Sequence, residues 1–383
     1  MKVRYVLHNA YGVGGTIRTV FNQANALCAE HDVEIASVYR SAAAPAFTLD
    51  SRVRLVPLTG LRSNGTNWDG TSRFWRKTRR LPNPLPHRWD FRYRRWDPVV
   101  DWHVVRYFRA QRDTILVTTR PGLNLLAAWF APRAAVRIGQ DHMNFGSYGP
   151  RLQRAIARAY PRLDAVTVLT RADLAAYQEA LGDTVRLARI PNGIPARPPV
   201  PPGERAPIVV AAGRLTRQKG FDLLIDAWAE VHAKHPDWQL HIHGAGNWRP
   251  RLAAQVTRRG LDRAVRLRGL TRTLDAELAQ ASIFALSSRR EGLPMVLLEA
   301  MAAGLPVVSF DCPTGPAEVV ADGVNGLLVP PEDVAGLAAG LSRLIADRGE
   351  RERMGGAARQ TATGYEMPVV AAQWNDLFAQ LAR

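Results

Sequence analysis

Residues 287–304 of the chain read SSRREGLPMVLLEAMAAG. The apolar run that precedes them ends at the two serines, Gly292 permits a sharp turn, and the apolar residues beyond it continue for the length of a helix. Pro294 suits the first helical position, where its missing N–H costs no hydrogen bond. The segment therefore predicts a buried strand, a tight turn and a helix, which together form half of a βαβ unit.

Short apolar runs alternate with longer amphipathic stretches on both sides of this segment, and this alternation is typical of an α/β protein with parallel sheets. In the second half of the chain, strands are expected at 207–212, 239–243, 264–269, 283–287, 306–310 and 326–329. In the first half, they are expected at 2–8, 32–39, 52–58, 114–119, 135–140, 165–170 and 185–190.

Two domains are expected, because 383 residues exceed what one hydrophobic core usually sustains. A proline-rich stretch near residue 200 has few backbone N–H groups that could form the hydrogen bonds of a sheet, and it is typical of a stiff linker. We therefore predict a first domain at residues 1–195, a linker at 196–206 and a second domain at 207–365.

Composition excludes several classes of protein. With 46% hydrophobic and 22% charged residues, the chain is neither disordered nor collagen-like. Cys28 and Cys312 are too few for a disulfide framework or a cysteine-based zinc site. No apolar run approaches the roughly 18 residues of a membrane-spanning helix, and the first apolar stretch is too short for a signal peptide. These features predict a cytoplasmic protein.

The formal charge of +17 is concentrated in the first half. Residues 1–200 contain 30 Lys or Arg and 14 Asp or Glu, whereas residues 201–383 contain 21 and 20. An arginine-rich genome is one explanation, but it does not account for a neutral second half. The asymmetry favours an anionic partner for the first half, such as acidic lipid, an acidic substrate or nucleic acid.

Residues 61–112 interrupt the strand–helix alternation with 13 Arg or Lys against four Asp. Tryptophans lie among these cations at Trp68, Trp75, Trp89, Trp96 and Trp102. Such a mixture suits a membrane interface or a platform for sugar, base or phosphate. The alternative is an insertion whose tryptophans pack it onto the first domain.

The first strand leads into a glycine turn, Gly12 to Gly15, which opens a helical pattern. Such a turn offers free N–H groups and a positive dipole end to phosphate, although it is equally compatible with a plain tight turn. As a nicotinamide-dinucleotide fingerprint it fails at Ile17, where glycine or alanine is required. The second domain lacks a Walker loop, because Gln218 occupies the position of the second glycine.

Arg214 and Lys219 follow the first strand of the second domain, at the edge where open α/β sheets bind ligands. Two cations there would hold a diphosphate, the arginine through its fork and the lysine as a point charge. Further along, Glu299 stands in an otherwise apolar helix and needs donors, which a vicinal diol of a sugar would supply. Glu291 would bind hydroxyls in the same way, unless each glutamate pairs with an arginine such as Arg289 or Arg290.

Several ordered motifs together resemble the retaining nucleotide-sugar glycosyltransferases of family four. The motifs are Gly213-Arg214 with Lys219-Gly220, Glu291-Gly292-Leu293-Pro294 with Glu299, Gly304-Leu305-Pro306-Val307-Val308, Gly315-Pro316-Ala317-Glu318, Asp322-Gly323 and Asn325-Gly326-Leu327-Leu328-Val329. The resemblance extends to Pro191-Asn192-Gly193-Ile194 and to Gly14-Gly15, and it is poorest over residues 61–112.

The resemblance implies a GT-B fold, in which two Rossmann-like domains with parallel sheets face a central cleft. The second domain would bind the donor nucleotide and the first the acceptor. Residues 366–383 would form a terminal helix, with Tyr365 and Trp374, that crosses back to the first domain.

The resemblance also implies roles for individual residues. Arg214 and Lys219 would neutralise the donor diphosphate, Glu299 would bind the ribose hydroxyls and Glu291 those of the transferred sugar. His142 matches a histidine that contacts the donor sugar, although its context also fits a packed loop histidine. The other expected donor-site residues are Gly14, Gly15, Gly292, Leu293, Pro294 and Met295.

The predicted function is transfer of a hexose from a UDP- or GDP-sugar, with retention, to a glycan, lipid-linked or polyanionic acceptor in cell-envelope synthesis. No cofactor or metal is expected, because the chain has no Asp-x-Asp and His241-x-His243 alone is a poor metal site. Peripheral contact with an anionic membrane is also expected. Alternatives are a nucleotide-sugar epimerase or hydrolase of the same fold and, with less support because no such motif occurs, a nucleic-acid-binding protein.

Overall fold

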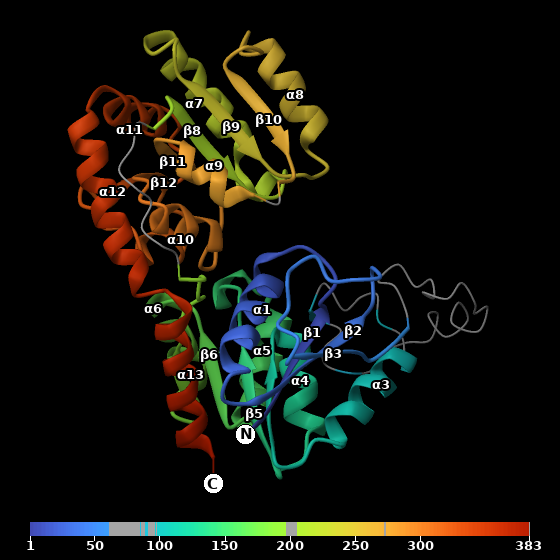
Figure 1. Cartoon of the computed structure of the whole chain (residues 1–383). Helices are drawn as coiled ribbons and strands as arrows, with labels where there is room; N and C mark the ends of the chain where they lie inside the picture. Colours follow the sequence, from blue (N-terminus) through green and yellow to red (C-terminus); the bar gives the residue numbers. More distant parts are fainter. Residues whose placement is uncertain are drawn as a thin grey trace. The chain divides into compact units, whose positions relative to one another are not determined.

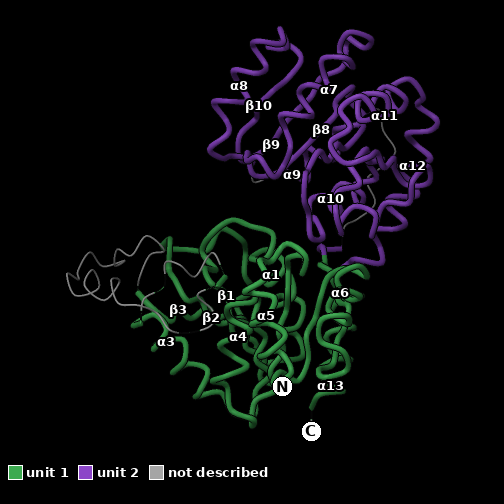
Figure 2. Tube along the Cα trace, turned by 180° about the vertical axis from the view of Figure 1, so that it is seen from behind, with its two compact units in different colours: residues 1–193, 367–383 green, residues 194–366 purple. Residues whose placement is uncertain are grey.

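A computed structural model of the chain describes residues 1–60, 85, 89–90, 96, 98–196, 205–271 and 273–382. The chain divides into two compact units, one formed by Met1–Gly193 with Met367–Arg383 and the other by Ile194–Glu366 (Figure 2). The sequence-based boundaries lie close by, at 195 and at 365. Each unit is an α/β body with its own parallel sheet.

The first unit has a seven-stranded sheet in the order β3-β2-β1-β4-β5-β6-β7, with every pair parallel. Its strands are β1 (Lys2–Asn9), β2 (Asp32–Tyr39), β3 (Arg54–Pro57), β4 (Thr114–Thr118), β5 (Ala135–Gln140), β6 (Ala165–Val168) and β7 (Arg186–Arg189). Its helices are α1 (Gly15–Leu27), α3 (Pro98–Arg109), α4 (Pro121–Phe130), α5 (Pro150–Ala159), α6 (Arg171–Leu181) and α13 (Met367–Leu381), with 3-10 turns η3 (Phe145–Ser147) and η4 (Tyr160–Arg162).

The second unit has a six-stranded parallel sheet in the order β10-β9-β8-β11-β12-β13. Its strands are β8 (Ile208–Ala212), β9 (Gln239–His243), β10 (Val265–Gly269), β11 (Ile283–Leu286), β12 (Val307–Phe310) and β13 (Gly326–Val329). Its helices are α7 (Phe221–Lys234), α8 (Arg249–Arg258), α9 (Leu274–Gln280), α10 (Met295–Ala302), α11 (Val334–Ala346) and α12 (Arg348–Thr363), with 3-10 turns η5 (Arg217–Lys219) and η6 (Pro316–Glu318) (Figure 1).

All thirteen expected strands are present, and their ends differ from the predicted ones by at most two residues. The predicted α/β fold class is therefore confirmed for both units. Each sheet reverses its strand order once, between β1 and β4 in the first unit and between β8 and β11 in the second. Ligands of open α/β sheets bind beyond the carboxyl ends of strands at such a reversal.

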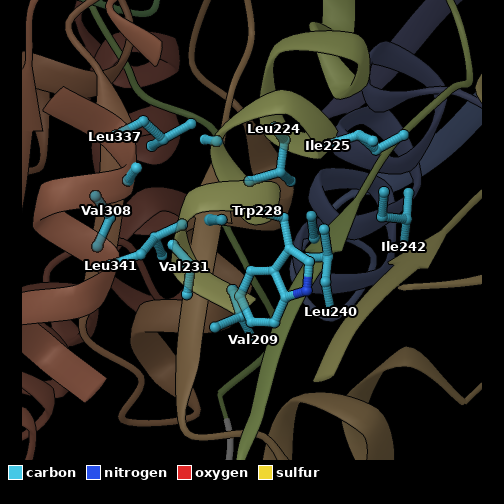
Figure 3. Close-up of a cluster of buried hydrophobic side chains, with 14 of the residues drawn as sticks. Val209, Leu224, Ile225, Trp228, Val231, Leu240, Ile242, Val308, Leu337 and Leu341 are labelled. Atoms are coloured by element: carbon cyan, nitrogen blue, oxygen red, sulfur yellow. The ribbon is translucent and has the colours of Figure 1, made fainter. Parts of the chain in front are cut away.

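The core of the second unit explains why its inner strands β8 and β11 are continuously apolar, whereas β9 and β10 alternate apolar with polar residues. Val209 of β8 and Leu240 and Ile242 of β9 pack against Trp228 of α7, which is fully buried (Figure 3). Leu337 of α11 contributes to the same cluster. Helices cover both faces of a parallel sheet, so both sets of alternating side chains of the inner strands β8 and β11 are apolar.

Helix α13 belongs to the first unit although it follows the second unit in sequence (Figures 1 and 2). Trp374 and Phe378 join the buried cluster that contains Val3 and Tyr5 of β1. Tyr365, expected in this helix, instead precedes it, and its hydroxyl donates to Glu318 O at 3.4 Å within the second unit.

The Pro-Asn-Gly-Ile motif that ends β7 anchors α1 and α13. Thr19 Oγ1 donates to Asn192 Oδ1 at 3.1 Å, and Asn22 Nδ2 donates to Gly193 O at 2.9 Å. A Cβ atom on Gly193 would overlap Met367 Sδ, so a larger residue here would force the Met367 side chain to shift. The motif therefore has a packing function.

Two predicted segment boundaries need correction. The Trp-rich insertion was expected to reach residue 112, but α3 is a core helix whose Val100, Val104 and Phe108 pack onto the first sheet. Trp68 and Trp75 lie outside the described residues, as do 197–204 of the predicted linker. Arg205 belongs to the second unit, because its guanidinium donates to Ala281 O at 2.9 Å and to Ala303 O at 2.6 Å.

Replacing Trp374 by alanine should destabilise the first unit by about 3–5 kcal/mol, because a fully buried indole is removed from its core. Val369→Ala on the same helix is the matched control, since Val369 is 44% exposed and its loss should change the free energy of unfolding by less than about 0.5 kcal/mol. Urea unfolding followed by circular dichroism measures both. Equal midpoints for the two variants would contradict the packing of α13.

Candidate functional site

Three loops meet at the carboxyl edge of the second sheet. They follow β8, β11 and β12, which are neighbours in the sheet, so parallel pairing brings the three loops to one edge. The loops span residues 213–220, 287–294 and 311–318. They contain most of the donor-site residues expected from the sequence.

Hydrogen bonds connect the first loop to the second. Arg289 N donates to Gln218 O at 2.8 Å, and Gln218 Nε2 donates to Arg290 O at 2.9 Å. Gly220 has φ +63°, and a Cβ atom there would overlap Ser287 O, so only glycine allows this approach.

The third loop packs on the second through a hydrogen bond to a backbone carbonyl group and a close approach of a glycine. Thr314 Oγ1 donates to Glu291 O at 3.0 Å. A Cβ atom on Gly315 would overlap Gly292 O. The three loops are therefore held to one another by close backbone approaches and by hydrogen bonds that end on backbone carbonyl groups. The side chains between them are positioned before any ligand binds.

Lys219 and Glu291 form an ion pair between these loops, with 2.6 Å between Lys219 Nζ and Glu291 Oε1. Ser288 Oγ donates to the same carboxylate oxygen at 2.5 Å. The side chains of Lys219 and Glu291 are only 14% and 7% exposed. A charge pair this buried is costly to break, because either partner alone would remain desolvated.

Arg289, one of the two arginines expected as alternative partners of the glutamates, binds other carboxylates. Arg289 instead donates from both terminal nitrogens to Asp222, at 2.9 Å each, and from Nε to Glu332 at 2.9 Å. Arg289 therefore fastens the second loop to α7, and Glu291 is left to Lys219.

Arg214 is exposed at the rim of the loops. Among the described residues, its guanidinium makes no hydrogen bond or ion pair. An exposed arginine with no partner among the described residues, in the same loop as the largely shielded Lys219, is suited to an incoming anion, which it can hold with two parallel hydrogen bonds.

The turn into α10 departs from the prediction by one residue. Pro294 is the residue before the helix, with φ −72° and ψ 114°, and α10 begins at Met295. The first amides of a helix have no acceptor within it, so those after Pro294 point toward the turn at Gly292. Glu299 is fully buried in this otherwise apolar helix, as expected, and Leu293 is buried beside the turn.

Cys312 lies in the third loop and is buried. Burial raises the pKa of its thiol to about 12, with a smaller contribution from the Glu291 carboxylate. The thiol is therefore neutral near pH 7 and is not a nucleophile.

In the first unit, the turn that follows β1 ends at Gly14, and Gly15 is the first residue of α1. No atom lies within 4 Å of a Cβ built on either residue, and the φ of 170° at Gly14 is extended backbone that any residue adopts. Neither packing nor strain requires glycine here. Close approach of a ligand to the backbone is a remaining reason for these two glycines.

His142 follows β5 in the first unit. Burial, together with Arg120, lowers the pKa of its imidazole to about 3. Its Nε2 is buried and has no hydrogen-bond partner within the described residues. The imidazole is thus neutral near pH 7, with a polar atom to offer to a hydroxyl group.

Asp141, which the sequence analysis did not select, anchors the turn that holds His142. Tyr177, Tyr160 and Tyr148 all donate to its carboxylate, the last two at 3.0 and 3.2 Å. Burial raises the pKa of Asp141 to about 7, although these hydrogen bonds lower it. The sequence around Asp141 does not show that three tyrosines bind its carboxylate, because these tyrosines lie elsewhere in the chain.

Comparison with known proteins gives the family. The glycosyl transferases group 1 family matches residues 206–347, which include all three loops. A GDP-mannose-dependent α-(1-6)-phosphatidylinositol monomannoside mannosyltransferase of Mycolicibacterium smegmatis is 32% identical over 261 residues, covering 63% of this chain and 68% of that enzyme. The chain belongs to the group 1 glycosyltransferases.

One relative of this glycosyltransferase is much longer. An exopolysaccharide phosphotransferase of Streptomyces coelicolor is 35% identical over 392 residues, which cover 100% of this chain but 41% of that protein. The chain therefore spans less than half of the length of that relative.

Solved structures confirm the fold of the glycosyltransferase. TarM of S. aureus, crystallised with fondaparinux, α-GlcNAc-glycerol and UDP, superposes with a TM-score of 0.79 at 16% identity, covering 99% of this chain and 100% of TarM. Both units are thus Rossmann-like domains of the GT-B type. A shared cleft between them stays a prediction.

Asp141→Asn should flatten the pH dependence of stability. Because folding raises the pKa of this carboxyl above its unfolded value, its favourable contribution is fully present below about pH 4 and is lost as the pH rises to about 7. Between these limits, the wild-type free energy of unfolding should fall by at least about 1 kcal/mol relative to the variant. Urea unfolding at several pH values measures this, and parallel profiles would contradict it.

Proposed function

We propose that this chain transfers a hexose from a nucleoside-diphosphate sugar to a hydroxyl group of a glycan or lipid acceptor, with retention at the anomeric carbon and without a metal ion. The observation that carries the proposal is the Lys219–Glu291 pair, which lies with Arg214 at the carboxyl edge of the second sheet. This edge belongs to the unit that the family matches.

The cations account for binding of the diphosphate. Lys219 Nζ has three donors and uses one for Glu291, and its other two have no acceptor among the described residues. Arg214 adds a planar pair of donors at the rim. The N-terminal amides of α10 add positive potential at the turn that precedes Met295.

The same groups account for the chemistry. When the bond between the anomeric carbon and the phosphate oxygen breaks, its electron pair stays on the diphosphate. The acceptor oxygen bonds to that carbon, and its proton passes to an oxygen of the departing diphosphate or to water. Fixed cations that bind the developing negative charge more tightly than the ground state lower the barrier. Arg214 and Lys219 take this role in place of a metal.

The remaining residues would bind the sugars of the donor. Glu299, buried in α10, would accept from the ribose hydroxyls, and Glu291 from those of the transferred hexose. His142 would contact the hexose through its neutral ring. Gly14 and Gly15 would let the backbone at the start of α1 approach the donor. We propose UDP or GDP as the nucleotide, since UDP is bound in TarM and the mycobacterial relative is named for GDP-mannose.

The acceptor is proposed from the relatives and from the surface of the first unit. The names of two relatives include an exopolysaccharide and a phosphatidylinositol mannoside, which suggests cell-envelope synthesis. No described helix is both long and apolar enough to cross a membrane.

A basic aromatic surface on the first unit supports contact with anionic lipid. It comprises Trp102, Arg106, Arg109, Trp129 and Arg162. Trp102 and Trp129 are 54% and 42% exposed, with arginine guanidinium groups 5.3 and 3.8 Å from their rings. Tryptophan with arginine suits a headgroup layer, where the ring is half immersed and the cation meets phosphate.

Donor binding tests the proposed function. Calorimetric titration with UDP and GDP in the presence of EDTA should show binding of one of the two nucleotides. Arg214→Gln should weaken it by about 10- to 100-fold, because a charged hydrogen-bonding partner of the diphosphate is lost. Arg217→Gln, an exposed cation of the same loop, is the matched control and should bind as the wild type.

Two results would overturn this assignment. Binding of neither nucleotide, or equal loss in both variants, would remove the diphosphate site. Turnover of a nucleotide sugar that is equally fast with and without an acceptor would favour the epimerase or hydrolase alternative. The anomeric configuration of the product, read by nuclear magnetic resonance, tests retention.

Vesicle binding tests the proposed membrane contact. Flotation with vesicles should increase with the fraction of anionic lipid and decrease with salt, because exposed charges are screened. The double variant Arg106→Gln and Arg162→Gln should lower the partition coefficient by about tenfold or more, since each cation contributes about 1 kcal/mol at such a surface. Arg259→Gln with Arg343→Gln removes the same charge from the second unit and should have little effect; equal loss would exclude a localised surface.

A further inference from the structure

A second cluster of polar side chains lies in the second unit, apart from the donor-site residues. His241 and His243 are two residues apart on β9, so their side chains leave the same face of the strand. Glu277 comes from α9, which follows the edge strand β10. One ligand atom from each of the three residues lies within 4.8 Å of the other two.

His243 is the most unusual member of the cluster. Its side chain is 3% exposed, and neither of its ring nitrogens has a hydrogen-bond partner within the described residues. Leaving a buried polar group unsatisfied costs about 1–3 kcal/mol. A cation at this position would satisfy the nitrogen lone pair.

The distances fit a small tetrahedral ion. His243 Nε2 and Glu277 Oε2 are 3.6 Å apart. Two ligands bound at about 2.1 Å with a tetrahedral angle lie about 3.4 Å apart. His241 is half-buried and the Glu277 side chain is 25% exposed, so rotation of these side chains can close the remaining separation.

We propose that His241, His243 and Glu277 bind a zinc ion, with water as the fourth ligand. Two imidazole nitrogens and one carboxylate oxygen suit Zn²⁺, whereas Mg²⁺ and Ca²⁺ take oxygen ligands. The sequence alone disfavours a metal site here, because it shows only the two histidines at strand spacing. The third ligand is 34 residues away in sequence and is added by the packing of α9 beside β9.

The ion would fasten α9, a helix of seven residues, to the sheet. A main-chain hydrogen bond connects this corner to the loop that contains Arg214, since Gly213 N donates to His243 O at 2.9 Å. Another joins the ends of β9 and β10, since Gly244 N donates to Gly269 O at 2.7 Å. A cavity of about 650 Å³, lined by His243 and Glu277 among others, gives access to solvent. The role is structural and does not depend on the proposed function.

Arg268 is the competing cation at this site. Its NH2 is 4.0 Å from Glu277 Oε1, too far for a hydrogen bond, and its side chain is 49% exposed. Two further cations, Arg249 and Arg266, and one carboxylate, Asp262, also line the cavity. Removing Arg268 should therefore tighten zinc binding, whereas removing Glu277 should weaken it.

The test is calorimetric titration of the full chain, without a histidine tag, after EDTA treatment and dialysis. Zn²⁺ should bind with a stoichiometry of one, and Co²⁺ should give the visible absorption of a tetrahedral ion. His241→Gln and Glu277→Gln should each weaken binding at least about tenfold, because a ligand is lost. His235→Gln and Glu352→Gln, a histidine and an exposed carboxylate elsewhere in this unit, are the matched controls.

Several outcomes would overturn the proposal. They are absence of Zn²⁺ binding, equal binding of Mg²⁺, unchanged affinity in Glu277→Gln, or weaker binding in Arg268→Gln. Tighter binding in Arg268→Gln would support the proposed position of the ion. Because Arg214→Gln leaves all three zinc ligands in place, zinc binding in that variant separates this proposal from failure of the donor site.

Discussion

The close approach of Gly220 to the carbonyl group of Ser287 is the constraint on which the site depends. Only a residue without Cβ can adopt this φ of +63° against that oxygen. The approach locks the loop after β8 to the loop after β11. It thereby brings Lys219 of one loop within 2.6 Å of Glu291 of the other. The close approach of Gly220 to Ser287 thus fixes the relative positions of the Lys219 and Glu291 side chains.

Preorganisation follows from this arrangement. The Lys219–Glu291 pair is largely shielded from water, so its attraction is screened little by solvent and its position is restricted. A backbone hydrogen bond from Arg289 to Gln218, together with side-chain donors that bind backbone carbonyl groups, holds the three loops together. A site built in this way loses little conformational entropy when a diphosphate binds. Its positive charge is already in position when negative charge develops on the leaving group. The exposed Arg214 is the one cation of this set that must still be ordered by the ligand.

The sequence predicted much of the fold and of the site. Apolar runs such as Ile208–Ala212 are short, β-branched and flanked by glycine, so every strand could be recognised within two residues. Arg214, Lys219, Glu291 and Glu299 could be selected because each stands at a fixed distance from a glycine turn or in an apolar helix. The start of α10 was misplaced by one residue, because proline is accepted both before and at the first helical position.

What the sequence by itself determined are the local features: strand positions, glycine turns, the charge asymmetry and the spacing of motifs. These depend on interactions between residues close in the chain, so a pattern along the chain records them. Tertiary structure alone decided which distant side chains meet. Glu291 pairs with Lys219 and not with Arg289, three tyrosines converge on Asp141, and Glu277 reaches the histidines of β9. Such contacts arise from strand order and helix packing, and a single sequence carries no periodic signal for them.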